Sequence, residues 1–431
     1  MNYLKKTASN LIELDRLVLY RNLLTDPLIA NLNKLINNIT SQHRKKRTAE
    51  KIYYQIHSNL IEFNEKNQLP GNLWQNYLVK LILTDKNIFS LNSENLGDKL
   101  GSSLYQAAYH DLKILHNLYQ LDLIKLGKKM NLKVPSFMVS FSPSRSEQNF
   151  TKLKSNFANS NHTKKLVKQL INYYHQYGAG KLNQYSAFHW QPQQGLKGIN
   201  KPDPISLDDL IGYEQQKERL IQNTESFLNG KQANNALLVG ASGTGKSSTI
   251  KALLNKYAKQ GLRLIEVSRN QLSHLPQLIE LLKERGLYFI IFMDDLSYED
   301  FETEYKHLKA IIEGGLEVKP DNLLFYATSN RRNLIKEKWS DRNQGESGEI
   351  HPSDGRQEKL SLAERFGITI TYLAPDQEKY LTIVNKLSNK YDITLSKEEL
   401  EKRAIQWEMQ QRGRSGRTAQ QFINYLLGEL N

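Results

Sequence analysis

The chain has 431 residues, 39% of them hydrophobic and 24% charged, which is typical of a globular protein of about three domain-sized units. It contains no cysteine, so disulfides and thiolate metal sites are excluded. No stretch approaches the roughly 18 apolar residues of a membrane span, and Glu13, Asp15 and Arg16 interrupt the apolar core that a signal peptide needs. We therefore expect a cytoplasmic protein with no membrane span.

The net charge of +14 is concentrated in the first 200 residues. These contain 27 Lys and Arg against 12 Asp and Glu, whereas residues 201–431 contain 32 against 33. A basic module of this kind is compatible with an acidic partner such as nucleic acid or anionic lipid, and equally with a lysine-rich surface that aids solubility. Both interpretations also apply to its densest basic run, Arg44-Lys45-Lys46-Arg47.

Residues 1–200 are predicted to form a mostly α-helical N-terminal module. Apolar residues recur there at helical spacing and indicate a stripe that faces a core, made of Leu112, Leu115, Leu118, Tyr119 and Leu121. A stretch rich in Ser and Pro predicts a linker near 136–160, and a second helical segment is expected at Lys164–Tyr174. The proline-containing stretch 191–204 is the predicted domain boundary, and it follows the aromatic residues Tyr185, Phe188 and Trp190.

From residue 235 onward, short apolar runs alternate with amphipathic stretches, a pattern typical of a parallel sheet flanked by helices. The predicted strands are Ala236–Val239, Leu262–Val267, Leu287–Met293, Leu323–Ala327 and Ile368–Leu373. Three helical segments follow, near 376–390, 396–410 and 417–429. We therefore predict an α/β domain at 205–375, built on a doubly wound parallel five-stranded sheet, and a small helical lid at 376–431.

The first predicted strand runs into the segment Gly240–Ser247, which matches the phosphate-loop motif G-x-x-x-x-G-K-[ST] at each fixed position. Its glycines allow backbone N–H groups to wrap a phosphate, and the following helix adds positive potential. Lys246 is expected to reach the β- and γ-phosphates of ATP, and the Ser247 hydroxyl to bind Mg²⁺. The candidate nucleotide-binding residues here are Gly240, Ser242, Gly243, Thr244, Gly245, Lys246, Ser247 and Ser248.

The apolar run at 287–293 ends in two carboxylates, Asp294 and Asp295. A buried strand that ends in this way places its carboxylates beside the bound phosphates. We expect Asp294 to hold Mg²⁺ through water and Asp295 to polarise the attacking water, the alternative being a solvated strand end.

With these motifs, residues 205–431 resemble the AAA+ ATPases. Residues 209–214 are similar to the segment that borders adenine in that family, which implies that Ile211 and Tyr213 contact the base. Asn330 ends the fourth predicted strand as the sensor-1 residue does, which implies that it orients the water. Residues 413–418 resemble the sensor-2 segment and make Arg417 a candidate contact of the γ-phosphate, with Arg414 as the alternative.

Residues 362–367 resemble the segment that carries the arginine finger, which identifies Arg365. A finger of this type stabilises transition-state charge on the nucleotide of the next subunit, so it implies a homo-oligomer. A local salt bridge from Arg365 to Glu364 or Asp376 is the alternative. Three segments, 234–238, 294–297 and 327–332, are similar to an uncharacterised bacterial AAA+ group.

The chain departs from the family at one position. Most AAA+ proteins have Asp-Glu at the strand end where this chain has Asp294-Asp295, and an aspartate is one methylene shorter. Hydrolysis is then expected to be slow, or to be helped by Glu299 or Glu302, both of which could instead be solvated helix residues.

Three functions are compatible with these residues. The first is an oligomeric ATP-hydrolysing machine that remodels an unidentified protein or nucleic acid. The second is a slow nucleotide-dependent switch that docks a partner, which the short Asp295 favours. The third is a loader that acts on nucleic acid, which the charge asymmetry favours and the lack of a recognised DNA-binding motif in residues 1–200 disfavours.

Overall fold

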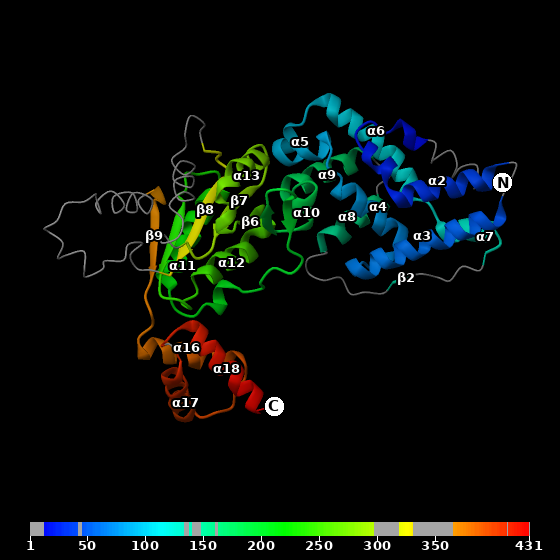
Figure 1. Ribbon diagram of the computed structural model, residues 1–431. Coiled ribbons are helices and arrows are strands. Elements are labelled where there is room, and N and C mark those ends of the chain that lie inside the picture. The colour runs from blue at the N-terminus through cyan, green and yellow to red at the C-terminus, as the bar shows by residue number, and fades with distance from the viewer. Residues whose placement is uncertain are drawn as a thin grey trace. The chain divides into compact units, whose positions relative to one another are not determined.

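The computed structural model of the chain describes residues 13–41, 45–132, 138–139, 148–159, 163–296, 319–330, 365–411 and 413–430. The chain divides into two compact units, Met1–Gln184 and Tyr185–Asn431 (Figure 1). In the described ranges, no helix has both the length and the apolar character that crossing a membrane requires.

The first unit is helical, as predicted. Its helices and short strands are η1 (Glu13–Arg16), η2 (Arg21–Thr25), α2 (Pro27–Thr40), α3 (Lys46–Asn67), β1 (Gly71–Asn72), α4 (Leu73–Thr84), α5 (Ile88–Leu96), η3 (Gly97–Lys99), α6 (Ser102–Tyr119), α7 (Leu123–Lys129), β2 (Met138–Val139), α8 (Gln148–Asn159), α9 (Thr163–Tyr177) and α10 (Lys181–Gln184). The predicted stripe on α6 faces the core, since Leu112, Leu115, Leu118 and Tyr119 are buried.

Helix α8 lies within the stretch predicted as a linker, so that part of the linker prediction is wrong. Phe150, Leu153 and Phe157 recur at a helical spacing and are buried against the core of the unit. The neighbouring Ser and Pro residues dominated the composition and masked this short amphipathic pattern.

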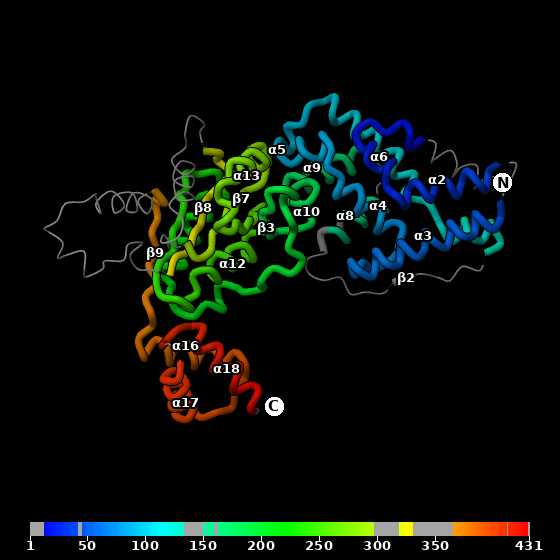
Figure 2. The backbone as a smooth tube through the Cα atoms, viewed as in Figure 1, coloured from blue at the N-terminus to red at the C-terminus, as the bar shows by residue number. Residues whose placement is uncertain are grey.

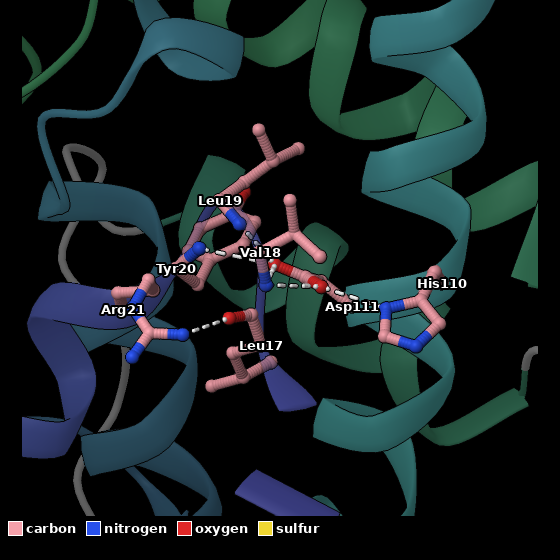
Figure 3. A network of polar contacts seen from close by, with 7 residues as sticks. All are labelled: Leu17, Val18, Leu19, Tyr20, Arg21, His110 and Asp111. Atoms are coloured by element: carbon pink, nitrogen blue, oxygen red, sulfur yellow. Dashed lines mark hydrogen bonds and ion pairs between the residues drawn. The ribbon is translucent and has the colours of Figure 1, made fainter. Parts of the chain in front are cut away.

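A buried carboxylate fastens the beginning of the first unit to α6 (Figure 3). The side chain of Asp111 is fully buried, and it accepts backbone hydrogen bonds from Val18 (3.0 Å), Leu19 (2.7 Å) and Tyr20 (3.1 Å). The ring of His110 lies beside it, with Nδ1 3.0 Å from an Asp111 carboxylate oxygen. Because a buried carboxylate without donors is costly, these bonds hold residues 18–20 against the helix.

The second unit is built on a seven-stranded sheet of order β4-β3-β6-β7-β8-β5-β9 (Figures 1 and 2). The strands are β3 (Ala187–Gln191), β4 (Gly195–Gly198), β5 (Ala236–Gly240), β6 (Leu262–Glu266), β7 (Tyr288–Met293), β8 (Leu323–Ser329) and β9 (Ile368–Tyr372). All pairings are parallel except that of β3 with β4. The fold class and the five predicted strands are confirmed.

Two strands were not predicted, and they correct the expected strand number from five to seven. The hairpin β3–β4 extends the sheet from β6, and it contains two of the aromatic residues that precede the predicted boundary. Phe188 and Trp190 are buried in β3 because aromatic side chains pack well on a pleated surface. Gly198 lies directly under the ring of Tyr185, where an added Cβ would come within 2.2 Å of a ring carbon.

The remaining elements flank the sheet or form the lid. They are η5 (Leu207–Asp209), α11 (Glu214–Leu228), α12 (Lys246–Tyr257), η6 (Ala258–Gln260), η7 (Arg269–His274), α13 (Leu275–Leu282), α16 (Gln377–Lys390), α17 (Lys397–Gln410) and α18 (Gly416–Leu430). The last three match the predicted lid helices and have an apolar core of their own, with Tyr380, Val384, Leu400, Phe422 and Ile423 at its centre.

Candidate nucleotide-binding site

The phosphate-loop motif joins the central strand β5 to α12, and its glycines have backbone conformations that other residues rarely adopt. Gly240, Gly243 and Gly245 have φ angles of 139°, 75° and 92°. At Gly240 an added Cβ would come within 1.9 Å of the carbonyl oxygen of Tyr372 on β9. The loop therefore follows its path only with glycine at these positions.

Lys246 is 5% exposed, and its ammonium group lies inside the loop. Its Nζ donates to the carbonyl oxygens of Gly240 (2.9 Å) and Ala241 (2.7 Å) and to Oδ1 of Asn330 (3.0 Å). Burial lowers the pKa of Lys246 to about 8, an effect that the carboxylates of Asp294 and Asp295 oppose. The hydrogen-bond partners of this buried ammonium are neutral oxygens, which phosphate oxygens would replace in a nucleotide complex.

The predicted Mg²⁺ ligands lie in contact across the site. The Ser247 hydroxyl donates to Oδ1 of Asp294 at 2.6 Å, and the Thr328 hydroxyl donates to the same oxygen at 2.5 Å. No cluster of three or more His, Cys, Asp or Glu suited to a metal occurs among the described residues. One hydroxyl and one carboxylate fit Mg²⁺, which usually completes its six ligands with phosphate oxygens and water.

Asp295 is held from three sides at the end of β7. Its N–H donates to the Thr328 hydroxyl at 2.9 Å, and its Oδ1 accepts from Nδ2 of Asn330 at 2.7 Å. Its other carboxylate oxygen lies 3.4 Å from a guanidinium nitrogen of Arg269, at the start of η7. The residue has φ 53°, a left-handed conformation, and its side chain is 56% exposed. The carboxylate is therefore oriented by Asn330 and neutralised by Arg269.

At the opposite end of the site, Tyr213 links the segment before α11 to the start of the lid. Its hydroxyl donates to the carbonyl of Leu373 at 2.6 Å, and its ring lies 5.0 Å from that of Tyr372. Lys379 of α16 places its Nζ 3.8 Å from the centroid of the Tyr213 ring, in a cation–π contact. Burial raises the pKa of the Tyr213 hydroxyl to about 12, so it remains a hydrogen-bond donor.

These residues enclose a cavity of about 590 Å³. The predicted site residues on its wall are Ile211, Tyr213, Ser242, Gly243, Thr244, Gly245, Lys246, Ser247, Ser248, Asp294, Asp295, Asn330 and Arg417. Thr328, Lys217, Ile383 and Leu387 also line it and were not predicted. Lys217 donates to the carbonyl of Leu210 at 2.7 Å and so braces the segment beside the expected base.

The lid contacts the phosphate loop directly. The backbone N–H of Arg417 donates to the carbonyl of Gly243 at 3.2 Å, which brings this arginine to the cavity wall. Arg414, the alternative, instead pairs with Glu408 at 3.3 Å within the lid. Lys390 at the end of α16 forms an ion pair with Asp209 and holds the pKa of that carboxyl at about 2.

Arg365 lies away from this cavity. It precedes Ile368, which pairs with Ala236 at the amino end of β5, whereas the phosphate loop leaves the carboxyl end of β5. The strand between these ends spans roughly 13 Å, so the backbone of Arg365 lies at the end of the sheet opposite the phosphate loop of its own chain. Glu299, Glu302 and Glu364, which were weighed as helpers or partners, lie outside the described residues.

The sequence profile of a family described as "Protein of unknown function (DUF815)" matches residues 183–430. The chain belongs to this family. It is a P-loop protein of the AAA+ group, as the motifs predicted, and the match starts just before the sheet and ends in the last lid helix.

Curated relatives match over short segments. The chain is 40% identical over 60 residues to the replication factor C large subunit of Methanococcus maripaludis (strain C7), which is 14% of this chain and 12% of that protein. It is 37% identical over 71 residues to the same subunit of Staphylothermus marinus, which is 16% of each. The matched segment thus spans well under two thirds of these relatives.

Solved structures of RuvB from Thermotoga maritima are also similar. For a mutant form, the identity is 17% and the TM-score 0.35, over 50% of this chain and 62% of that one. For the form titled "RuvB Holliday junction branch migration motor", the identity is 17% and the TM-score 0.31, over 52% and 72%.

Proposed function

We propose that the protein binds ATP with Mg²⁺ and hydrolyses it to ADP and phosphate. The observation that carries this proposal is the convergence of Lys246, Ser247, Asp294 and Asn330 on one wall of a 590 Å³ cavity under a glycine-rich loop. Lys246 would bind the β- and γ-phosphates, while Ser247 and Asp294 would hold Mg²⁺. The metal, when bound, would withdraw charge from the phosphates.

Asp295 is the proposed base for the attacking water. Its Oδ1 is oriented by the amide of Asn330, whose own Oδ1 accepts from Lys246. The same amide therefore links the phosphate-binding ammonium to the base. Arg417 is the proposed lid contact of the γ-phosphate, because its backbone already reaches the loop at Gly243.

We further propose a homo-oligomer in the cytoplasm, in which Arg365 of one subunit completes the site of the next. Its location at the amino end of the sheet supports a role in trans, since its own cavity opens at the carboxyl end. Hydrolysis would move the lid through the contacts of Arg417 and Tyr213 and so remodel a bound protein or nucleic acid.

A slow nucleotide-dependent switch is the second candidate, and the ion pair of Asp295 with Arg269 favours it. The guanidinium occupies one side of this carboxylate, and the side chain is a methylene shorter than glutamate, so it reaches less far toward an attacking water. ATP would then order the lid and dock a partner, with hydrolysis serving release.

Steady-state ATPase assays on the wild type and on Lys246→Ala test the proposal. We expect Mg²⁺-dependent turnover that Lys246→Ala abolishes without unfolding the chain. Wild-type turnover far below one per minute, together with tight ATP binding, would favour the nucleotide-dependent switch over the remodelling machine. Equal turnover in the wild type and in Lys246→Ala would show that the activity arises outside this site.

A further inference from the structure

One end of the first unit carries a concentration of exposed cations. Lys45, Lys46, Arg47 and Lys51 occupy the start of α3, and α7 adds three lysines. We define the α3–α7 basic surface as these exposed residues, namely Lys45, Lys46, Arg47, Lys51, Lys125, Lys128 and Lys129.

The two helices are fastened together at this end. The buried hydroxyl of Tyr53 in α3 donates to the carbonyl of Leu123, the first residue of α7, at 3.1 Å. Figure 1 shows α7 beside the end at which α3 begins. Cations that are about 80 residues apart in the sequence therefore lie at the same end of the first unit.

Helix periodicity separates this surface from the core. Ala49, Tyr53 and Ile56 are buried on one side of α3, and the 3.6-residue repeat places Arg47 and Lys51 on the opposite side. Glu50, half-buried, lies in the second turn of α3, and Asp122, exposed, is the N-cap of α7. None of the ion pairs found among the described residues involves Lys45, Lys46, Arg47, Lys51, Lys128 or Lys129.

This arrangement works against the stability of α3. Helices α2, α4, α5 and α7 begin at side-chain caps, which are Asp26, Asn72, Asn87 and Asp122. Helix α3 begins at Lys45 with no side-chain cap and has no acid in its first turn. Positive charge at a helix N-terminus is repelled by the helix dipole. Folding stability therefore gives no reason for the cations to gather here.

We propose that the α3–α7 basic surface binds the phosphate backbone of a nucleic acid. Charge complementarity carries the proposal, since the first unit has 26 Lys and Arg against 12 Asp and Glu and these seven cations share one end of it. An anionic membrane is disfavoured, because a membrane-surface helix needs large apolar residues between its cations. The only large hydrophobic residue exposed on the described part of either helix is Tyr54, at 43%.

The exposed ring of Tyr54 lies on the same side of α3 as Arg47 and Lys51, and it offers a surface on which a base could stack. This proposal rests on the proposed ATPase function in one respect: it names nucleic acid as the macromolecule on which the ATPase acts. Binding at this surface needs neither ATP nor hydrolysis, so the two proposals fail separately.

Fluorescence anisotropy of the full chain with a labelled 20-nucleotide oligo-dT and a 20-base-pair duplex, between 50 and 200 mM KCl, tests the proposal. With six or seven phosphate contacts, wild-type affinity should fall by roughly 10³-fold or more over this range. A variant with Gln in place of Lys45, Lys46, Arg47 and Lys51 loses about four contacts. Raising the salt from 50 to 200 mM should then reduce the affinity of this variant by a factor about 10² smaller than the factor for the wild type.

The matched control removes the same charge elsewhere on the first unit, by replacing four exposed lysines on α2, η3, α6 and α9 with Gln, namely Lys34, Lys99, Lys113 and Lys168. It should keep the wild-type salt slope. Equal losses in both variants, no binding at 50 mM, or binding to phosphatidylserine vesicles but not to either oligonucleotide would overturn the inference. Lys246→Ala should lose ATP and keep nucleic-acid binding, which separates this proposal from the ATPase.

Discussion

The buried ammonium of Lys246 predicts how ATP affinity depends on pH. Burial lowers the pKa of this lysine to about 8 in the nucleotide-free protein, with carbonyl oxygens of the loop as its nearest partners. Bound phosphates would stabilise the charged form and raise the pKa again. ATP therefore binds the protonated lysine more tightly, and affinity is fully present below pH 8 and falls as the pH rises above it.

The magnitude follows from the free-protein pKa. At pH 9 about one tenth of the lysine is protonated, so the ATP dissociation constant should be roughly tenfold larger than at pH 7. Titration of a fluorescent ATP analogue at pH 7, 8, 9 and 9.5 measures this slope. Lys246→Arg is the matched control, because a guanidinium stays charged throughout and its curve should be flat.

A wild-type affinity that is constant from pH 7 to 9.5 would refute the reasoning, because Lys246 would then keep its charge in the free protein. A slope of the same size in Lys246→Arg would assign the titration to another group.

Three further predictions follow from individual contacts. Asp295→Asn should bind ATP as the wild type does and hydrolyse it at least 10²-fold more slowly, because it loses the proposed base; unchanged single-turnover rates would exclude that role. Arg365→Ala subunits mixed with Lys246→Ala subunits should regain ATPase activity, since each supplies what the other lacks, and a wild type that stays monomeric in ATP would contradict this. Asp111→Ala leaves three N–H groups without their acceptor, so amide exchange of residues 18–20 should rise by 10²-fold or more while a lid peptide stays unchanged; equal protection would refute the anchoring role.

Local motifs made much of the site predictable. Gly240 to Ser247 are contiguous, and a strand followed by a glycine-rich turn and a helix brings them together by chain geometry alone. Asp294 and Asp295 follow an apolar strand, and the carboxyl ends of parallel strands meet at one edge of the sheet. The sequence therefore predicted residues that line two walls of this cavity.

Two of the partners that orient these residues, Thr328 and Arg269, were not predicted, because each is remote in the sequence. Thr328 bridges Asp294 and Asp295 from a strand more than 30 residues away, and Arg269 reaches Asp295 from a short helix that follows β6. Thr328 lies in the segment 327–332, but that resemblance assigned a role only to Asn330, and Arg269 lies in no recognised motif. Their positions depend on which strands become neighbours, which is a tertiary property.

The two strands that the prediction missed are short. The hairpin β3–β4 has strands of 5 and 4 residues, and its alternating aromatic residues were also compatible with packing against the nucleotide domain. The hairpin is extended because β3 pairs with β6. That pairing joins residues almost 80 positions apart in the sequence. Short strands of this kind are specified by partners more than by their own composition.

Calorimetric titration of the full chain with ATP, with and without Mg²⁺, tests the central claim most directly. We expect saturable binding of one ATP per chain that requires Mg²⁺ for full affinity and weakens by roughly 10²-fold in Lys246→Ala. Absence of binding by the wild type, or identical binding by the folded Lys246→Ala variant, would contradict the assignment of this cavity as an ATP site.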